Sequence, residues 1–235
     1  MIPRPENPLV VALDLPDLDA AAGLAERLAG RVGMLKVGLE LFAASGPEAV
    51  RRIAAHGPVV LDLKLHDIPT TVERAARVLG RLGIAMLTVH AVGGEPMVAA
   101  AVRGAAAGAD DAGLAPPVIA AVTVLSSQGG APLAPPTSLA SLAIAAGALA
   151  VVVSGGDVAR VREAVGEEPC LVVPGIRPEG SEVHDQVRVL TPGAAIEAGA
   201  DYLVVGRPIA GAPDPVRAAR EILAAARRGA HRNRR

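Results

Sequence analysis

The chain has 235 residues, of which 51% are hydrophobic and 20% are charged. This composition is typical of a folded globular protein and excludes disordered, fibrous and disulfide-rich classes. Charged residues, Pro or Gly interrupt every apolar run before it reaches the roughly 18 residues that a spanning helix needs, so no membrane segment is predicted. No secretory signal pattern opens the sequence, and a single cysteine cannot form an internal disulfide, so we expect a cytoplasmic protein.

Aromatic content and charge argue against a nucleic-acid partner. The chain has one Phe, one Tyr and no Trp, so bases have almost no aromatic surface on which to stack. The formal net charge is −1 although arginines crowd the C-terminus, so the rest of the chain is acidic and unsuited to polyanions. We interpret residues 229–235 as a basic, disordered tail, although such a run also suits contact with nucleic acid or anionic lipid.

Short apolar runs alternate with Ala-rich stretches of helical spacing along the chain. The runs are predicted as strands at Leu9–Asp14, Met34–Gly38, Val59–Lys64, Met86–Ala91, Val118–Leu125, Ala150–Ser154, Cys170–Pro174 and Tyr202–Gly206. The stretches between them predict helices over residues 17–31, 46–56, 69–83, 95–107, 137–148, 156–165, 192–199 and 214–228. Continuous apolar strands are typical of a parallel sheet. This pattern predicts a single α/β domain, a (β/α)8 TIM barrel over residues 8–228 with an arm at 1–7, rather than an open doubly wound sheet.

Charged residues lie in or directly after several predicted strands. They are Asp14 at the end of the first strand, Lys36 in the second, Asp62 and Lys64 in the third, His90 at the end of the fourth and Arg207 after the eighth. Active sites of (β/α)8 barrels form at the C-terminal ends of the strands and in the loops that follow. These charged residues are therefore the candidate site.

Asp62 and Lys64 are two residues apart on one strand, so both side chains point to the same face. Two ionised groups between apolar residues are costly unless they pair, and an isolated pair is equally well explained as a structural salt bridge. Lys36 on the neighbouring second strand favours catalysis, because a second cation requires another anion, which Asp67 can supply. Four alternating charges in a desolvated site are typical of a catalytic array. The alternative role for Asp67 is a helix cap ahead of Pro69.

The histidines do not form an evident site. His66 and His90 are the conventional acid–base candidates, but both lie in turn-forming stretches, where a bond to loop backbone is the commoner role. His56, His184 and His231 are scattered without metal-ligand spacing, and a single cysteine excludes a cysteine-based zinc site. No metal site is predicted.

Two late segments are candidates for phosphate binding. Gly206 and Arg207 follow the eighth strand, where barrels commonly place a short helix N-terminus against phosphate, and Arg207 adds guanidinium donors. Arg177 and Gln186 lie near the two ends of a long polar loop, which is either a lid over a ligand or a surface excursion. The motifs GxxxxGK[ST] and GxGxxG are absent, so nucleoside triphosphates and dinucleotide cofactors are not indicated.

Seven segments together resemble the orotidine 5′-phosphate decarboxylase family. They are Ala12-Leu-Asp14, Leu35-Lys-Val-Gly38, Asp62-Leu-Lys-Leu-His-Asp-Ile-Pro-Thr-Thr71, Thr88-Val-His-Ala-Val-Gly-Gly94, Pro174-Gly-Ile-Arg177, Asp185-Gln-Val-Arg-Val189 and Val204-Val-Gly-Arg207. The resemblance implies a cofactor-free barrel that converts orotidine 5′-monophosphate to uridine 5′-monophosphate and CO₂, the last step of de novo pyrimidine synthesis.

The resemblance also implies roles for single residues. Lys64 is expected to protonate C6 of the pyrimidine, with Lys36, Asp62 and Asp67 as the rest of the charge array. A homodimer with shared sites is expected, in which Asp67 and Thr71 reach the partner's site beside Asp14 at the ribose. The other expected substrate contacts are Ser126 at the pyrimidine and Arg177, Gln186, Gly206 and Arg207 at the phosphate. Residues 127–136 differ most from the family pattern.

Two alternatives to the decarboxylase stay open. A magnesium-dependent sugar-phosphate decarboxylase or synthase of the same barrel lineage resembles the chain between Asp62 and Asp67, but those relatives carry a metal-binding Glu where this chain has Lys36. An ammonium at that position repels a divalent cation. A catalytically silent nucleotide-binding barrel is the other alternative, and the intact charge array argues against it, because unused buried charge is costly.

Overall fold

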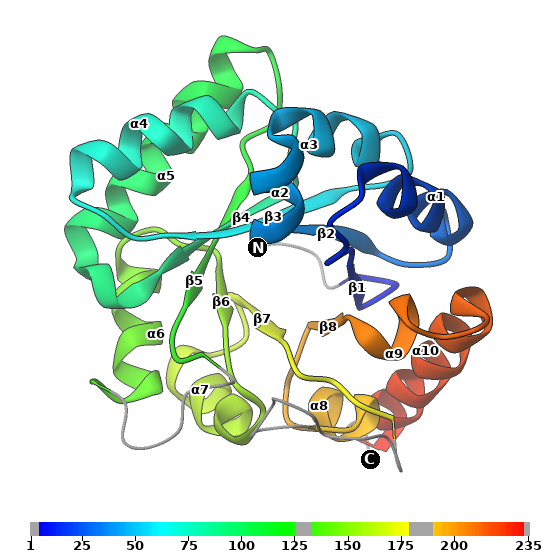
Figure 1. The fold of residues 1–235 in the computed structure, drawn as a ribbon. Helices are drawn as coiled ribbons and strands as arrows, with labels where there is room; N and C mark the ends of the chain where they lie inside the picture. Colours follow the sequence, from blue (N-terminus) through cyan, green and yellow to red (C-terminus); the bar gives the residue numbers. More distant parts are fainter. Residues whose placement is uncertain (1–4, 126–132, 179–189, 233–235) are drawn as a thin grey trace.

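The computed structural model describes residues 5–125, 133–178 and 190–232. Within them, eight parallel strands pair in chain order and close into a barrel that helices surround (Figure 1). The strands are β1 (Leu9–Ala12), β2 (Met34–Gly38), β3 (Val59–Leu65), β4 (Met86–His90), β5 (Val118–Val122), β6 (Ala150–Val152), β7 (Cys170–Val173) and β8 (Tyr202–Val205). Each strand overlaps one of the predicted runs, which confirms the predicted (β/α)8 barrel.

The helices occupy the outer layer of the barrel (Figure 1). They are α1 (Leu18–Leu28), α2 (Leu39–Ser45), α3 (Pro47–Ala54), α4 (Pro69–Gly80), α5 (Gly94–Asp111), α6 (Pro136–Ala145), α7 (Val158–Val165), α8 (Pro192–Glu197), α9 (Arg207–Ala210) and α10 (Pro215–Arg232), with the 3₁₀ turns η1 (Ala91–Gly93) and η2 (Gly155–Asp157). Several begin as their sequence dictates. The Asp17 carboxylate accepts the Ala20 backbone N–H at 2.7 Å and caps α1, and Pro occupies the first turn of α3, α4, α6 and α8.

Helices α2, α9 and the end of α10 differ from the prediction. Helices α2 and α9 lie outside the predicted ranges, and Gly46, with φ of 58°, separates α2 from α3 where one helix was expected to begin. Helix α10 continues to Arg232 beyond the predicted end at 228, so the predicted tail at 229–235 begins inside a helix. Within this extension a Cβ on Gly229 would lie 2.3 Å from the carbonyl oxygen of Gly193, so the missing side chain lets α10 pack closely on α8.

Side chains alternate along each strand between two cores. The inward-facing set fills the barrel interior with Val10, Val60, Met86, Ala120, Ala150, Cys170, Val172 and Tyr202. The residues between them, such as Val11, Leu35 and Leu87, point outward and are fully buried against the helices. Because the alternation has a period of two, the next inward-facing residue of each strand lies at the open, C-terminal end of the barrel.

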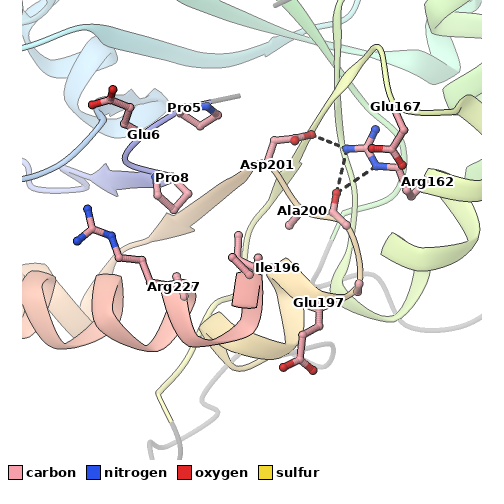
Figure 2. Close-up of a pocket in the computed structure, with 14 residues that line it drawn as sticks. Pro5, Glu6, Pro8, Arg162, Glu167, Ile196, Glu197, Ala200, Asp201 and Arg227 are labelled. Carbon is pink, nitrogen blue, oxygen red and sulfur yellow. Dashed lines mark hydrogen bonds and ion pairs between the residues drawn. The ribbon is translucent and has the colours of Figure 1, made fainter. Parts of the chain in front are cut away.

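A buried ion pair lies at the N-terminal ends of β7 and β8, opposite the open end of the barrel. Arg162 of α7 donates to the carbonyl oxygens of Pro169 and Gly199, both at 2.9 Å, and pairs with Asp201 just before β8 (Figure 2). Asp201 also accepts the Leu171 backbone N–H at 2.8 Å. The pair lines one side of a cavity of about 660 Å³. Since each charge is already bound to protein groups, the pair joins α7 to the segments before β7 and β8 rather than waiting for a ligand.

Candidate active site

The upper layer of inward-facing side chains forms the floor of an open cavity of about 640 Å³ at the C-terminal ends of the strands. One side of this floor is polar and the rest is aliphatic. Strands β2 to β4 contribute Lys36, Asp62 and Thr88, whereas β1 contributes Ala12 and strands β5 to β8 contribute Val122, Val152, Val172 and Val204. The register of the sheet therefore places a cluster of charges against a wall of low polarity, where electrostatic interactions are stronger than in water.

The charges form a continuous chain of ion pairs across the polar side. Lys36 Nζ lies 2.8 Å from Asp14 Oδ1 and 3.4 Å from Asp62 Oδ2, and Lys64 Nζ lies 2.8 Å from Asp62 Oδ1. The prediction that Asp62 and Lys64 share a face is thus confirmed. Lys36 and Lys64 are the only lysines in the chain, whose other basic side chains are arginines and histidines. Gly38 leaves room for the ion pair between Lys36 and Asp14, because a Cβ at position 38 would lie 2.5 Å from Asp14 Oδ1.

The surroundings of Asp62 keep its carboxylate ionised. Burial by itself raises the pKa of Asp62, but the charges of Lys36 and Lys64 outweigh it, aided by hydrogen bonds from Lys64 and Thr88, so the pKa is lowered below its ordinary value. Thr88 Oγ1 donates to Asp62 Oδ1 at 2.9 Å. Sequence reasoning did not select Thr88 as a site residue, although a polar residue at an inward position of an apolar strand was the available signal.

Lys64 occupies an irregular point of β3. Leu61 pairs with Leu87 and Leu65 pairs with Val89, so β3 holds more residues between these pairs than β4. Lys64 has φ of 52°, the only positive value for a residue other than glycine in the described part of the chain. A left-handed conformation is unfavourable for a side chain with a Cβ, and residues held in such conformations are enriched at functional sites. The bulge also turns the Lys64 ammonium toward the cavity that it lines.

Asp67 and Thr71 lie apart from this cavity. Both are exposed, and Asp67 Oδ1 accepts the backbone N–H of Ile68 at 2.6 Å beside the start of α4. No ion pair joins Asp67 to Lys64 between the described residues of one chain, so within a single chain Asp14 supplies the second anion of the array. The expected contact of Asp67 and Thr71 with a partner's site stays a prediction.

Two arginines line the other side of the cavity together with Gly206. Arg177 is buried; its side chain donates to the Ile176 carbonyl oxygen at 3.0 Å, and its backbone N–H donates to the Leu190 carbonyl oxygen at 3.0 Å. Arg207 is exposed and begins the short helix α9. The structure thus brings Arg177, Gly206 and Arg207 to the cavity that holds the lysines. Ser126 and Gln186 lie outside the described residues, so their predicted contacts stay untested.

His66 and His90 form a pair beside the cavity, with ring centroids 5.6 Å apart, and neither side chain lines it. Burial lowers the pKa of His90, and the nearby His66 and Lys64 add to this effect while Asp62 opposes it. These effects favour the neutral form of the His90 side chain. Across the described residues, His, Cys, Asp and Glu side chains do not gather into a group of three or more that suits a metal ion. None of the helices described is long and apolar enough to cross a membrane.

Comparison with known proteins identifies the family. The model of the family described as "Orotidine 5'-phosphate decarboxylase / HUMPS family" matches residues 7–222. The chain belongs to this family. The match spans all eight strands of the barrel, so the family includes every strand that positions the cavity. The resemblance expected from the sequence motifs is confirmed.

Relatives within the orotidine 5′-phosphate decarboxylase / HUMPS family match nearly the whole chain. The chain is 53% identical to orotidine 5′-phosphate decarboxylase of Anaeromyxobacter sp. (strain K), a match that covers 94% of this chain and 99% of the relative. It is 49% identical to the enzyme of that name from Moorella thermoacetica, covering 93% of this chain and 92% of the relative. The crystal structure of orotidine 5′-phosphate decarboxylase from Lactobacillus acidophilus superposes with a TM-score of 0.80 at 35% identity, covering 94% and 99% of the two chains.

Proposed function

We propose that the chain is an orotidine 5′-phosphate decarboxylase, a carboxy-lyase that converts orotidine 5′-monophosphate to uridine 5′-monophosphate and CO₂ in pyrimidine biosynthesis. The observation that carries this proposal is the chain of ion pairs from Asp14 through Lys36 and Asp62 to Lys64 on the floor of the cavity. Relatives with this name are about half identical to the chain over nearly its full length.

Loss of CO₂ is difficult because it leaves an electron pair in an sp² orbital of C6, which the ring does not delocalise well. The bond between C6 and the carboxylate carbon breaks, its electrons stay on C6, and CO₂ leaves. The ammonium of Lys64 stabilises this negative charge and then transfers one proton from Nζ to C6. A charge held in place before the reaction requires no reorganisation, and such preorganised electrostatics is usually the largest catalytic contribution.

Asp62 and Lys36 prepare Lys64 for this role. The Asp62 carboxylate accepts a hydrogen bond from Lys64 Nζ at 2.8 Å and so fixes the position of the amine that must deliver the proton. Lys36, 3.4 Å from the other carboxylate oxygen, balances the charge of Asp62. Asp62 beside the substrate carboxylate also destabilises that negative group, an effect that we rank below stabilisation of the carbanion.

The remaining lining residues assign an orientation to the substrate. In the proposed complex, Arg177, Gly206 and Arg207 bind the 5′-phosphate together with Gln186. The ribose lies beside Asp14 and Lys36, and the pyrimidine lies between Lys64 and the wall of valines, where Ser126 contacts it. A guanidinium and the backbone N–H groups at the start of α9 are suitable ligands for a phosphate dianion.

A homodimer with shared sites is part of the proposal. Asp67 and Thr71 are exposed around the start of α4, and the side chain of Ile68 between them is 67% exposed. An exposed apolar residue among polar residues suits burial in an interface. Mixing inactive Lys64→Ala subunits with inactive Asp67→Ala subunits should restore activity, because a hybrid dimer has one site with both defects and one with neither. Absence of restored activity despite demonstrated subunit exchange would refute the shared site.

The test of the proposed function is the loss of orotidine 5′-monophosphate, followed by ultraviolet absorbance with purified protein in the presence and absence of EDTA. Turnover that is unaffected by EDTA supports a decarboxylase without a metal or other cofactor. Turnover that EDTA abolishes supports the magnesium-dependent alternative, and tight binding of uridine 5′-monophosphate without turnover supports a silent nucleotide-binding barrel. We expect a cytoplasmic enzyme, since a chain with one cysteine cannot form the internal disulfides that an oxidising compartment would favour.

A further inference from the structure

Thr88 lies where the irregular part of β3 meets β4. The bulge between Leu61 and Leu65 takes the backbone N–H of Lys64 out of the regular ladder of hydrogen bonds with β4. The Thr88 side chain supplies the acceptor instead, because its Oγ1 lies 2.9 Å from that N–H. A buried N–H without an acceptor is costly, so this bond stabilises the unusual backbone of Lys64.

The same hydroxyl is bonded to Asp62. Thr88 Oγ1 donates to Asp62 Oδ1 at 2.9 Å, and Lys64 Nζ donates to the same oxygen at 2.8 Å. The three residues therefore form a closed ring in which Thr88 contacts both the backbone of Lys64 and the carboxylate that binds the Lys64 ammonium. A hydroxyl has a single proton, and the bond to Asp62 uses it. Thr88 is 4% exposed, so water does not compete for these bonds.

We propose that Thr88 is a positioning residue, whose hydroxyl holds the Lys64 backbone and the Asp62 carboxylate in the arrangement that aims the Lys64 ammonium into the cavity. The inference rests on the proposed decarboxylase function for its kinetic consequence, although not for the contacts themselves. Thr88 lines the cavity floor, but the bond to Asp62 leaves it no proton to donate to the substrate, and the role assigned to it is exerted through its neighbours.

Substitution of Thr88 by valine or by serine distinguishes the role of its hydroxyl from the packing of its methyl group. Thr88→Val keeps the shape of the side chain and removes the hydroxyl, whereas Thr88→Ser keeps the hydroxyl and removes a methyl group. Thr123 provides a matched control, because it is also 4% exposed and its Oγ1 donates to the Val152 carbonyl oxygen at 2.9 Å, but it does not line the cavity. Thr123→Val thus removes an equally buried hydroxyl from the same barrel.

The kinetic measurement is kcat and KM for orotidine 5′-monophosphate as a function of pH. We expect Thr88→Val to lower kcat by roughly 10- to 100-fold, the size of effect given by a lost hydrogen bond to a charged group, with KM changed by less than about threefold. The acid limb of kcat should move to higher pH, because Asp62 loses a donor while Lys36, Lys64 and His90 still face it. Thr88→Ser should return kcat to within about threefold of wild type, and Thr123→Val should leave kcat and the acid limb unchanged.

A spectroscopic measurement tests the contacts independently of activity. Since the chain has two lysines, labelling with ¹⁵N-lysine gives two backbone amide signals, from Lys36 and Lys64. In Thr88→Val the backbone amide signal of Lys64 should shift, and its proton should exchange faster with solvent. The Lys36 amide signal should stay unchanged in Thr88→Val, and the signals of both lysine amides should stay unchanged in Thr123→Val.

Three results would overturn the role of Thr88. They are a wild-type kcat in Thr88→Val, an equal loss of kcat in Thr88→Val and Thr88→Ser, and an unchanged Lys64 amide signal in Thr88→Val. Loss of the Lys64 contact in Thr88→Val, together with a wild-type protein that does not decarboxylate the substrate, would instead overturn the proposed function and leave the contact established. If Thr88→Val does not fold, Thr88→Ser decides the question, because the proposal requires it to keep the wild-type Lys64 amide signal and kcat.

Discussion

Removing the Lys64 ammonium is the most direct perturbation of the proposed chemistry. At an effective dielectric constant of about 20, a unit positive charge about 4 Å from the developing carbanion contributes roughly 4 kcal/mol, which is about a thousandfold in rate. The proton donor is lost as well, and positioned proton transfer contributes about 10²- to 10⁴-fold. We therefore expect Lys64→Ala to lower kcat/KM by at least about 10⁵-fold.

The same substitution should have little effect on stability. The Lys64 side chain is 35% exposed, and after its removal Asp62 still has Lys36 at 3.4 Å and the Thr88 hydroxyl at 2.9 Å. A partly exposed ion pair with a second cation in place contributes about 1 kcal/mol, which corresponds to a fall of roughly 2–4 °C in Tm for a chain of this size. The large loss of activity and the small loss of stability distinguish a functional charge array from a structural salt bridge.

Thermal unfolding and steady-state decarboxylation of the same preparation measure both quantities. Arg51→Ala is the control, because it removes a cation whose ion pair with Glu48, at 2.7 Å, is exposed and does not line the cavity. The control should keep wild-type kcat/KM. Activity of Lys64→Ala within tenfold of wild type would refute its role as proton donor. A drop in Tm far beyond the expected few degrees, matching the loss of activity, would show that the array mainly holds the fold together.

Two further predictions concern the phosphate end of the cavity and the barrel interior. Arg207→Ala should lower kcat/KM about 10- to 100-fold for orotidine 5′-monophosphate and much less for orotidine, which lacks the phosphate. Equal losses of kcat/KM for both substrates in steady-state assays would show that Arg207 does not bind the phosphate. Burial, with smaller effects of Cys170 and Asp201, raises the pKa of Tyr202 to about 12, and because Tyr202 is the only tyrosine, the ultraviolet absorbance of tyrosinate reports this residue alone. The folded protein then retains the Tyr202 proton that the unfolded chain loses near pH 10, so the free energy of unfolding should fall as pH rises from 10 to 12. The Tyr202→Phe variant should not show this pH dependence. A tyrosinate midpoint near 10 in the folded protein would contradict the prediction.

The strands of this protein follow from local sequence, because each is a short apolar run bounded by polar or turn-forming residues, and alternation then decides which side chains point inward. The place of Asp62 and Lys64 on one strand could be predicted for the same reason, although the bulge between Leu61 and Leu65 interrupts the regular alternation from which their common face was predicted. The end of α10 could not be predicted in this way. Gly229 disfavours a helix locally, and only its contact with Gly193 on a helix distant in the sequence makes that glycine suitable.

The composition of the charge array depended on tertiary structure. Asp67 is three residues from Lys64 and was the local candidate for the second anion, whereas Asp14, in the loop after β1, occupies that place within one chain, 2.8 Å from Lys36 Nζ. The bulge at Lys64 and its bond to Thr88 also have no local signal, because they arise from the register between β3 and β4. Periodicity assigns a residue to a face of its own strand, but which residues of different strands touch is decided by the stagger of strands that close into a barrel.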